Sequence, residues 1–216
     1  MNLQIVAHLF QPHDLVGGHV AVDLINTVTA RDSQPVDWLV DYPALVGWAT
    51  LTAQFGSADL DRLRKLAHRA PRAARAALLR STALREALGA ILAAIVEEAT
   101  PPAVDLATLD QARRAAGRAA ALRAFAGEVR VAWSVERSGL DLITHVVADA
   151  AVRLLESLPS HRLRRCDGRD CGWLFLDTSK NGRRRWCDMA TCGNSAKARR
   201  HLAKLSARSR RPPPRP

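Results

Sequence analysis

The residues of this chain best suited to bind a metal ion are its four cysteines, all of which lie in the last quarter of the sequence. They form two pairs, Cys166 with Cys171 and Cys187 with Cys192, and four residues separate the members of each pair. Two closely spaced thiolate pairs can surround one tetrahedral ion, and four cysteines are a common ligand set of structural zinc. We therefore predict that these residues hold one structural zinc ion.

Two other uses of the same thiols are open at this point, namely two disulfide bonds or an iron–sulfur cluster. The N-terminal segment has neither the basic stretch nor the small-residue cleavage site of a secretory signal, so we expect a cytoplasmic protein with reduced thiols. No apolar run approaches the roughly 18–20 residues that cross a bilayer, and we expect no membrane partner. The hairpin-and-helix pattern around the cysteines favours zinc over iron.

That pattern begins between the two cysteine pairs. Trp173, Phe175 and Asp177 alternate with Leu174 and Leu176, which predicts a strand. Asn181-Gly182 is typical of a two-residue hairpin turn, and residues 183–186 are the predicted return strand. The second cysteine pair follows directly.

A helix is predicted after the last cysteine, over residues 196–208, with Asn194 or Ser195 as its N-cap. Cys192 then lies near the helix N-terminus, where the helix dipole favours a thiolate. The order of knuckle, β-hairpin and helix resembles a treble clef. One stripe of this helix is expected to pack on the zinc core, and it consists of Ala198, Leu202 and Leu205.

Positive charge is concentrated around the cysteines. Residues 161–216 contain 16 Lys and Arg against 4 Asp, a net charge of +12, whereas residues 1–160 carry a net charge of −1. A solvated surface is the plain alternative, but this charge exceeds what solubility requires and predicts contact with DNA phosphates. The residues expected to bind DNA are Arg183, Arg184, Arg185, Asn194, Lys197, Arg199, Arg200 and Lys204.

Two alternatives to DNA binding remain, an RNA-binding protein and a protein–protein adaptor that uses the zinc module as a scaffold. Trp173 and Phe175 could stack on RNA bases, although packing beside the zinc ion is the more ordinary role for them.

The rest of the chain predicts a mainly α fold with a small β component. Pro159-Ser160 marks the boundary between a helical N-terminal domain, residues 1–159, and the zinc module, residues 160–208, and residues 209–216 form a disordered basic tail. In the N-terminal domain Asp41 marks a helix start, and Val129, Val131 and Trp133 predict a strand. The longer predicted helices cover residues 72–99 with arginines on the polar side, 105–125 with a break at Gly117, and 140–158.

Residues 166–194 resemble the CGNR zinc finger, which is named for a Cys-Gly-Asn-Arg run beginning at the last ligand. The resemblance implies the same four ligands and a DNA-binding transcription factor. Here the run reads Cys192-Gly193-Asn194-Ser195, so Ser replaces the naming Arg. Upstream, the segment from Gly17 to Thr27 is similar to the opening of the ABATE domain, which accompanies this finger in proteins linked to stress-induced transcription regulation.

Polar residues interrupt the apolar segment near the N-terminus. Asp23, Asn26 and Thr27, with Arg31 nearby, could line a pocket for a small effector, or they could form a buried polar network that bonds to the backbone. No nucleophile elbow, zinc-protease motif or phosphate-binding loop occurs, so we do not expect an enzyme. We expect instead a homodimer, joined through the N-terminal domain.

Overall fold

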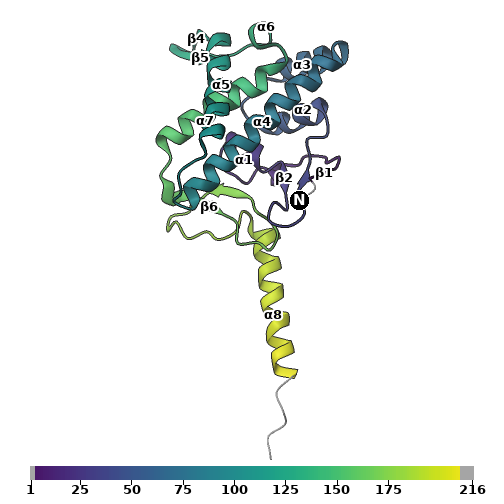
Figure 1. The fold of residues 1–216 in the computed structure, drawn as a ribbon, viewed down its shortest axis with the longest axis vertical. Helices are drawn as coiled ribbons and strands as arrows, with labels where there is room; N and C mark the ends of the chain where they lie inside the picture. The colour runs from purple at the N-terminus through teal and green to yellow at the C-terminus, as the bar shows by residue number, and fades with distance from the viewer. Residues whose placement is uncertain (1–2, 210–216) are drawn as a thin grey trace, which may run out of the picture.

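The computed structural model describes the backbone of residues 3–209 and the side chains of residues 3–203 (Figure 1). It confirms a mainly α fold with small sheets. We call residues 1–159 the body and residues 160–208 the cysteine module. The helices are α1 (Val20–Ile25), α2 (Tyr42–Leu51), α3 (Ser57–Arg69), α4 (Pro71–Val96), α5 (Ala103–Ala119), α6 (Val135–Ser138), α7 (Leu142–Ser157) and α8 (Asn194–Ser209). The strands are β1 (Gln4–Ile5), β2 (Val28–Thr29), β3 (Val36–Asp37), β4 (Ala121–Phe125), β5 (Glu128–Ala132), β6 (Leu163–Arg165) and β7 (Leu174–Leu176).

The longest helix, α4, lies at the centre of the body, in contact with α1, α2, α3, α5 and α7 (Figure 1). Its apolar side supplies Leu84, Leu88 and Ile91 to the main core. Of the neighbouring helices, α2 begins after Asp41, as predicted. The Asp41 carboxylate accepts the Ala44 amide at 2.8 Å and so caps the start of α2.

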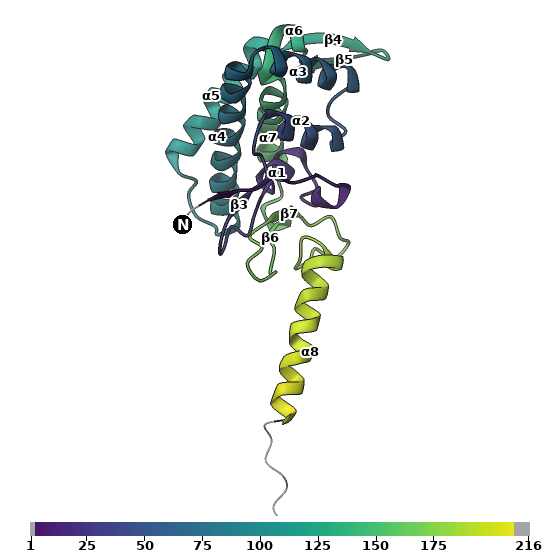
Figure 2. The ribbon, with the colours of Figure 1, turned by 90° about the vertical axis from the view of Figure 1, so that its right-hand side faces the viewer.

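The helix predicted over residues 105–125 is wrong beyond Ala119. Gly117 does not break α5, which continues to Ala119, and the next residues form β4, which pairs antiparallel with β5. Ala126 and Gly127 connect the two strands with φ of 48° and 85°, the backbone of a two-residue hairpin turn. That turn brings residues 121–125 beside β5, which contains the predicted strand residues Val129 and Val131. Residues 121–125 therefore form strand hydrogen bonds with β5 and are not helical. The hairpin projects from the end of the body farthest from α8 (Figure 2).

A three-stranded sheet in the order β1-β3-β2 packs beside α4, and it corrects a second expectation. We expected the arginines of α4 on its polar side, yet Arg85 is 1% exposed. Its guanidinium donates to both carboxylate oxygens of Asp37 in β3, each at 2.7 Å, and to the Thr27 hydroxyl at 3.2 Å. Because Asp37 and Thr27 bond to Arg85, a buried charged pair lies where helical periodicity alone predicted solvent.

The cysteine module begins with a two-stranded antiparallel sheet of β6 and β7. The strand predicted around residue 175 is therefore present, but its partner is not residues 183–186. That segment runs as a loop, bound by the Asp177 carboxylate, which accepts the Arg184 amide at 2.8 Å. The side chain of Asp177 thus supplies the bond that a return strand would have supplied.

Helix α8 extends from the module away from the body (Figures 1 and 2). A π-helical turn, Met189–Gly193, precedes it, and Asp188 caps this turn by accepting the Thr191 amide, so neither Asn194 nor Ser195 is the cap. Cys192 does lie at the helix start, as predicted. Ala198 and Leu202 do not pack on the cysteines, because both are exposed, Leu202 by 62%.

The predicted tail falls outside the described residues from 210 onward, and the side chains of Lys204 and Leu205 lie outside them as well. Among the helices described, none is long and apolar enough to cross a membrane.

Candidate metal centre and nucleic-acid interface

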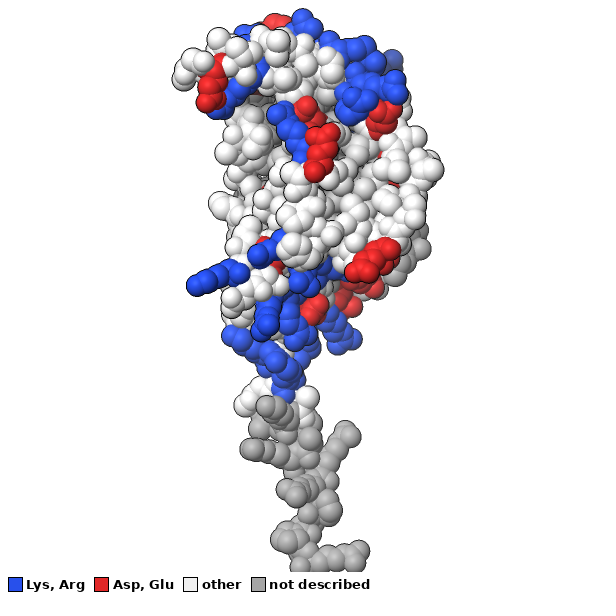
Figure 3. Space-filling view, turned by 90° about the vertical axis from the view of Figure 1, so that its left-hand side faces the viewer, with Lys and Arg blue, Asp and Glu red and all other residues white. Residues whose placement is uncertain are grey.

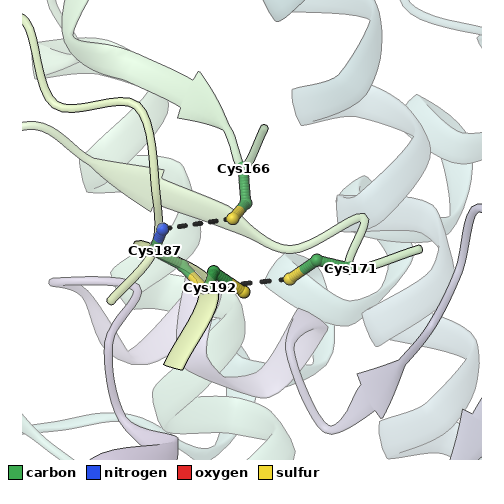
Figure 4. A group of neighbouring side chains, drawn as sticks. All are labelled: Cys166, Cys171, Cys187 and Cys192. Atoms are coloured by element: carbon green, nitrogen blue, oxygen red, sulfur yellow. Dashed lines mark hydrogen bonds between the residues drawn. The ribbon is translucent and has the colours of Figure 1, made fainter. Parts of the chain in front are cut away.

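Four thiols from three separate segments meet at one point of the cysteine module (Figure 4). Cys166 follows β6, Cys171 precedes β7, Cys187 precedes the turn that leads into α8, and Cys192 lies within that turn. All four sulfur atoms lie within 4.8 Å of one another, and the sulfur of Cys187 is 3.8 Å from those of Cys171 and Cys192. The fold therefore brings the four predicted ligands together.

The spacing of the sulfurs fits one tetrahedral ion. Zinc–thiolate bonds of about 2.3 Å place the sulfurs of a tetrahedron about 3.8 Å apart, whereas a disulfide needs about 2.05 Å. The cysteines are free thiols. Without a cation, bonds from the Cys171 and Cys187 thiols lower the pKa of Cys166. The bonds of Cys187 to Cys166 and Cys171, then burial and the repulsion between adjacent thiolates, raise the pKa of Cys187. A divalent cation removes this repulsion by binding all four thiolates.

Backbone amides hold the first ligand in place. The sulfur of Cys166 accepts the amides of Gly168 at 3.3 Å and of Cys187 at 3.2 Å. Such bonds orient a metal ligand and offset its negative charge. The loop between Cys166 and Cys171 also leaves no room for a side chain at Gly168. A Cβ there would lie 2.7 Å from the sulfur of Cys192 and 3.2 Å from that of Cys166.

Replacing Gly168 by Ala is therefore expected to weaken zinc binding by roughly 10- to 100-fold, the usual effect of disturbing the surroundings of a metal ligand. Competition with a chromogenic zinc chelator measures the change. Gly117→Ala is the control, because a Cβ at that helical glycine meets nothing within 4 Å. Unchanged zinc affinity in G168A would contradict the close contact of Gly168 with the sulfurs of Cys166 and Cys192.

The loop between β7 and the second cysteine pair depends on Asp177, which is 2% exposed. Its carboxylate accepts the Ser179 hydroxyl at 2.5 Å and the amides of Ser179 and Arg184 at 2.9 and 2.8 Å, and these bonds, chiefly that of the hydroxyl, lower the pKa of Asp177 to about 2. Arg184 lies over the Phe175 ring, 4.6 Å from its centroid, and donates to the Trp186 and Cys187 carbonyls. Its guanidinium therefore holds the loop beside the ligand Cys187.

The other described residues that were predicted to bind DNA differ in whether their side chains have partners. The Arg185 guanidinium pairs with Asp167 at 2.7 Å. Arg183, Lys197 and Arg199 are exposed and have no ion-pair partner among the described residues. At the start of α8, Asn194 and Arg200 are also exposed, and their side chains donate to the Ala190 and Ala196 carbonyls at 3.2 and 3.4 Å. Figure 3 shows Lys and Arg gathered over the module and the first turns of α8.

The side chains of Trp173, just before β7, and of Phe175, within it, are not available to nucleic-acid bases in this conformation. Phe175 is fully buried, and Trp173 is 9% exposed. The Trp173 indole donates to the Val28 carbonyl at 3.0 Å and meets the Trp38 ring edge to face at 5.7 Å. These side chains fill the space beside the cysteines, which confirms the packing role.

The cysteine module is joined to the body by a contact that sequence reasoning missed. The Asn26 side chain accepts the Leu174 amide at 3.1 Å and donates to the Leu174 carbonyl at 2.9 Å, so it pairs with β7 as a neighbouring strand would. The Gly17 carbonyl accepts the Leu176 amide at 2.9 Å. The only available signal was the polar Asn26 in an apolar segment, and it does not reveal a partner 148 residues away.

The three polar residues expected near an effector bond mainly to the backbone. Asp23 accepts the Gly17 amide at 2.8 Å, Asn26 binds Leu174, and the Thr27 hydroxyl donates to the Leu24 carbonyl at 2.7 Å. Arg31 pairs with Glu86 at 2.8 Å and lines a cavity of about 270 Å³. Asp23, Asn26 and Thr27 line neither this cavity nor the larger one described below. Effector binding by these four residues stays a prediction.

Asp23 makes the stability of the body depend on pH. Burial raises its pKa to about 6 from 3.8, against the opposing effect of the Gly17 amide. The folded state therefore favours the protonated acid, so its stabilising contribution is complete below pH 3.8 and is lost as the pH rises to about 6.

Replacing Asp23 by Asn, which keeps an acceptor for Gly17, is expected to stabilise the protein above pH 6 by up to about 3 kcal/mol and to have no such effect below pH 4. Urea unfolding at pH 7.5 and pH 4 checks this difference. Asp61→Asn, on the exposed side of α3, is the control. A stabilisation that is equal at the two pH values would show that ionisation is not its cause.

Comparison with known families agrees with this geometry. Residues 18–157 match the family model ABATE, described as "Putative stress-induced transcription regulator". Residues 162–204 match the model of the CGNR zinc finger, and this match contains all four cysteines. No curated protein matches the chain. The four thiolates thus form the site of one structural zinc ion.

Proposed function

The chain belongs to the ABATE family of transcription regulators and carries a CGNR zinc finger, and from this membership we propose that it regulates transcription by binding DNA through the cysteine module while the body senses a signal or small ligand. The observation that carries the proposal is a group of exposed cations around the zinc site, Arg183, Lys197 and Arg199, which form no ion pair with the residues that the structure describes. On this proposal the chain is a binding protein and not an enzyme.

The shape of the module supports duplex DNA as the target. Helix α8 has 16 residues, about 24 Å of helix, and projects away from the body (Figure 1). The major groove of B-DNA is about 12 Å wide and admits one helix. Lys197 and Arg199 lie on its first turns, where they would contact phosphates or base edges, and Lys204 is farther along the same helix. The naming Arg of the finger would add a cation here, but Ser195 replaces it.

The RNA alternative is weaker, because Trp173 and Phe175, its stacking candidates, are buried. One module offers few groups that read bases, so we propose that two copies act together as a homodimer joined through the body.

The test is binding of the zinc-loaded full chain to labelled genomic duplex fragments and to structured RNA, measured by fluorescence anisotropy at several salt concentrations. R183A/K197A/R199A removes three proposed phosphate contacts. It is expected to reduce the slope of log affinity against log salt concentration by up to about 3. The loss of affinity is expected to be the same for every DNA sequence. Arg184→Ala would not serve, because this side chain holds the loop beside Cys187.

The matched control is R69A/R72A/R123A, which removes three exposed arginines of the body that form no ion pair among the described residues. It changes the net charge equally. If both triple variants lose the same affinity, binding reflects overall charge and not the module. Failure to bind either nucleic acid at low salt would refute the proposal and favour the adaptor role.

A further inference from the structure

A cavity of about 1010 Å³ lies in the body, between the N-terminal strands and helices α2, α3 and α4. Buried apolar side chains form its walls, among them Val46, Ala67, Ala74 and Leu78. Its volume is at the upper end of the range for small-molecule sites, whose walls are mostly apolar. The cavity therefore has the size and lining to take the hydrocarbon body of a small molecule.

The rim of the same cavity is also apolar and is open to solvent. Ile5 and Leu79 are 64% and 60% exposed, and Leu3 and Val40 are exposed beside them. Large apolar side chains that gather on a surface usually mark a binding site, whereas single ones need no explanation.

The charged groups around the cavity favour an anion. Each of its acids is already engaged: Asp37 by Arg85, Glu86 by Arg31 and Arg85, and Asp41 by the amide that starts α2.

Two of the basic side chains at the rim, unlike the acids, have no partner among the described residues. Arg64 pairs with Asp61 on the surface, but Arg75 and His68 are exposed and have no hydrogen-bond or ion-pair partner among the described residues. The N–H groups of these two side chains are thus open to an acidic ligand at the mouth of an apolar cavity.

The floor of the cavity is connected to the zinc module by direct contacts. Arg85 lines the cavity and bonds both Asp37 and Thr27. Trp38, which follows Asp37, meets Trp173 of the module. Asn26, which precedes Thr27, holds the backbone of β7. A ligand that moves Arg85 or β3 would therefore act on the contact of Trp38 with Trp173 and on that of Asn26 with Leu174.

We propose that this cavity binds an apolar organic anion, with its hydrocarbon body between α2, α3 and α4 and its acidic group at Arg75 and His68. The further role of this ligand as the signal for the DNA-binding module rests on the function proposed above, but the binding itself does not.

Two fluorescent probes with nearly the same rings separate the apolar from the anionic part of the site. Anilinonaphthalene sulfonate carries the charge, and N-phenylnaphthylamine lacks it. The full, zinc-loaded chain is expected to bind one sulfonate probe per chain and to bind the uncharged probe roughly tenfold more weakly. Decanoate is expected to displace the sulfonate probe at lower concentration than decanol does.

Variants locate the site. Arg75→Ala is expected to weaken binding of the sulfonate probe by roughly tenfold and to leave the uncharged probe unchanged. Arg72→Ala is the matched control, because Arg72 is an exposed arginine one turn away on α4 that does not line the cavity. Ala83→Trp, which adds a ring to an exposed residue of the wall, is expected to exclude both probes.

Equal affinity for the two probes, or sulfonate binding that persists in both R75A and A83W, would overturn the proposal. A shift from dimer to monomer in A83W, seen by sedimentation without probe, would overturn it by assigning this face to a second copy of the chain. Decanoate that binds at Arg75 without changing the affinity for DNA would instead contradict the signalling role in the proposed function, and the anion site would stand.

Discussion

Replacing Cys187 by Ser is expected to abolish stoichiometric zinc binding and to unfold the cysteine module. Cys187 is buried, lies 3.8 Å from two other ligand sulfurs, and donates its own amide to the sulfur of Cys166. In zinc-finger peptides the metal contributes about 10–16 kcal/mol of apparent binding free energy at neutral pH, and that energy is folding energy. A module with so small a core has little to replace it.

The loss is expected to extend into the body, because Leu163 and Leu174 of the module belong to the main core. Zinc content by elemental analysis and thermal unfolding by circular dichroism measure the two effects. Ser195→Ala, at an exposed position three residues after the last ligand, should keep full zinc content and an unchanged melting temperature. Full zinc occupancy in C187S would refute the ligand set.

Replacing Arg85 by Met is expected to destabilise the body by about 3–5 kcal/mol, the cost of leaving one member of a buried ion pair without its partner. Asp37 is 5% exposed, and with Arg85 removed the Leu39 amide would be the one described donor left to its carboxylate. Urea unfolding at neutral pH measures the change.

The exposed pair of Arg80 with Asp141 provides the control on the same helix, and Arg80→Met is expected to cost less than about 1 kcal/mol. The double variant R85M/D37L should recover much of the loss, since apolar residues of similar volume can replace a buried pair. If R85M unfolds no earlier than R80M, the Arg85–Asp37 pair does not hold β3 against α4.

The sequence predicted what local chemistry determines. The spacing of the cysteines indicated the ligand set, Asp41 before Pro43 indicated a helix start, and apolar periodicity indicated α4 and α7. Each of these features depends on residues close together in the chain.

Features that depend on distant partners could not be predicted in this way. The pairing of β7 with β6, and not with residues 183–186, depends on how Asp177 binds the loop. The burial of Arg85 depends on Asp37, which lies 48 residues away. The 62% exposure of Leu202 also could not be predicted from periodicity, which identifies an apolar stripe but not how much of it is buried.

The contact between Asn26 and β7 limits how this zinc finger could be exchanged between proteins. A finger cut at the sequence boundary near Pro159 would lose the side chain that pairs with Leu174 and the Val28 carbonyl that accepts the Trp173 indole. Strand β7 would then expose the backbone amide and carbonyl of Leu174, which now form hydrogen bonds with Asn26 of the body. A graft onto another protein would therefore need to include the segment from Gly17 to Val28, so recombination should preserve the two segments together although more than a hundred residues separate them.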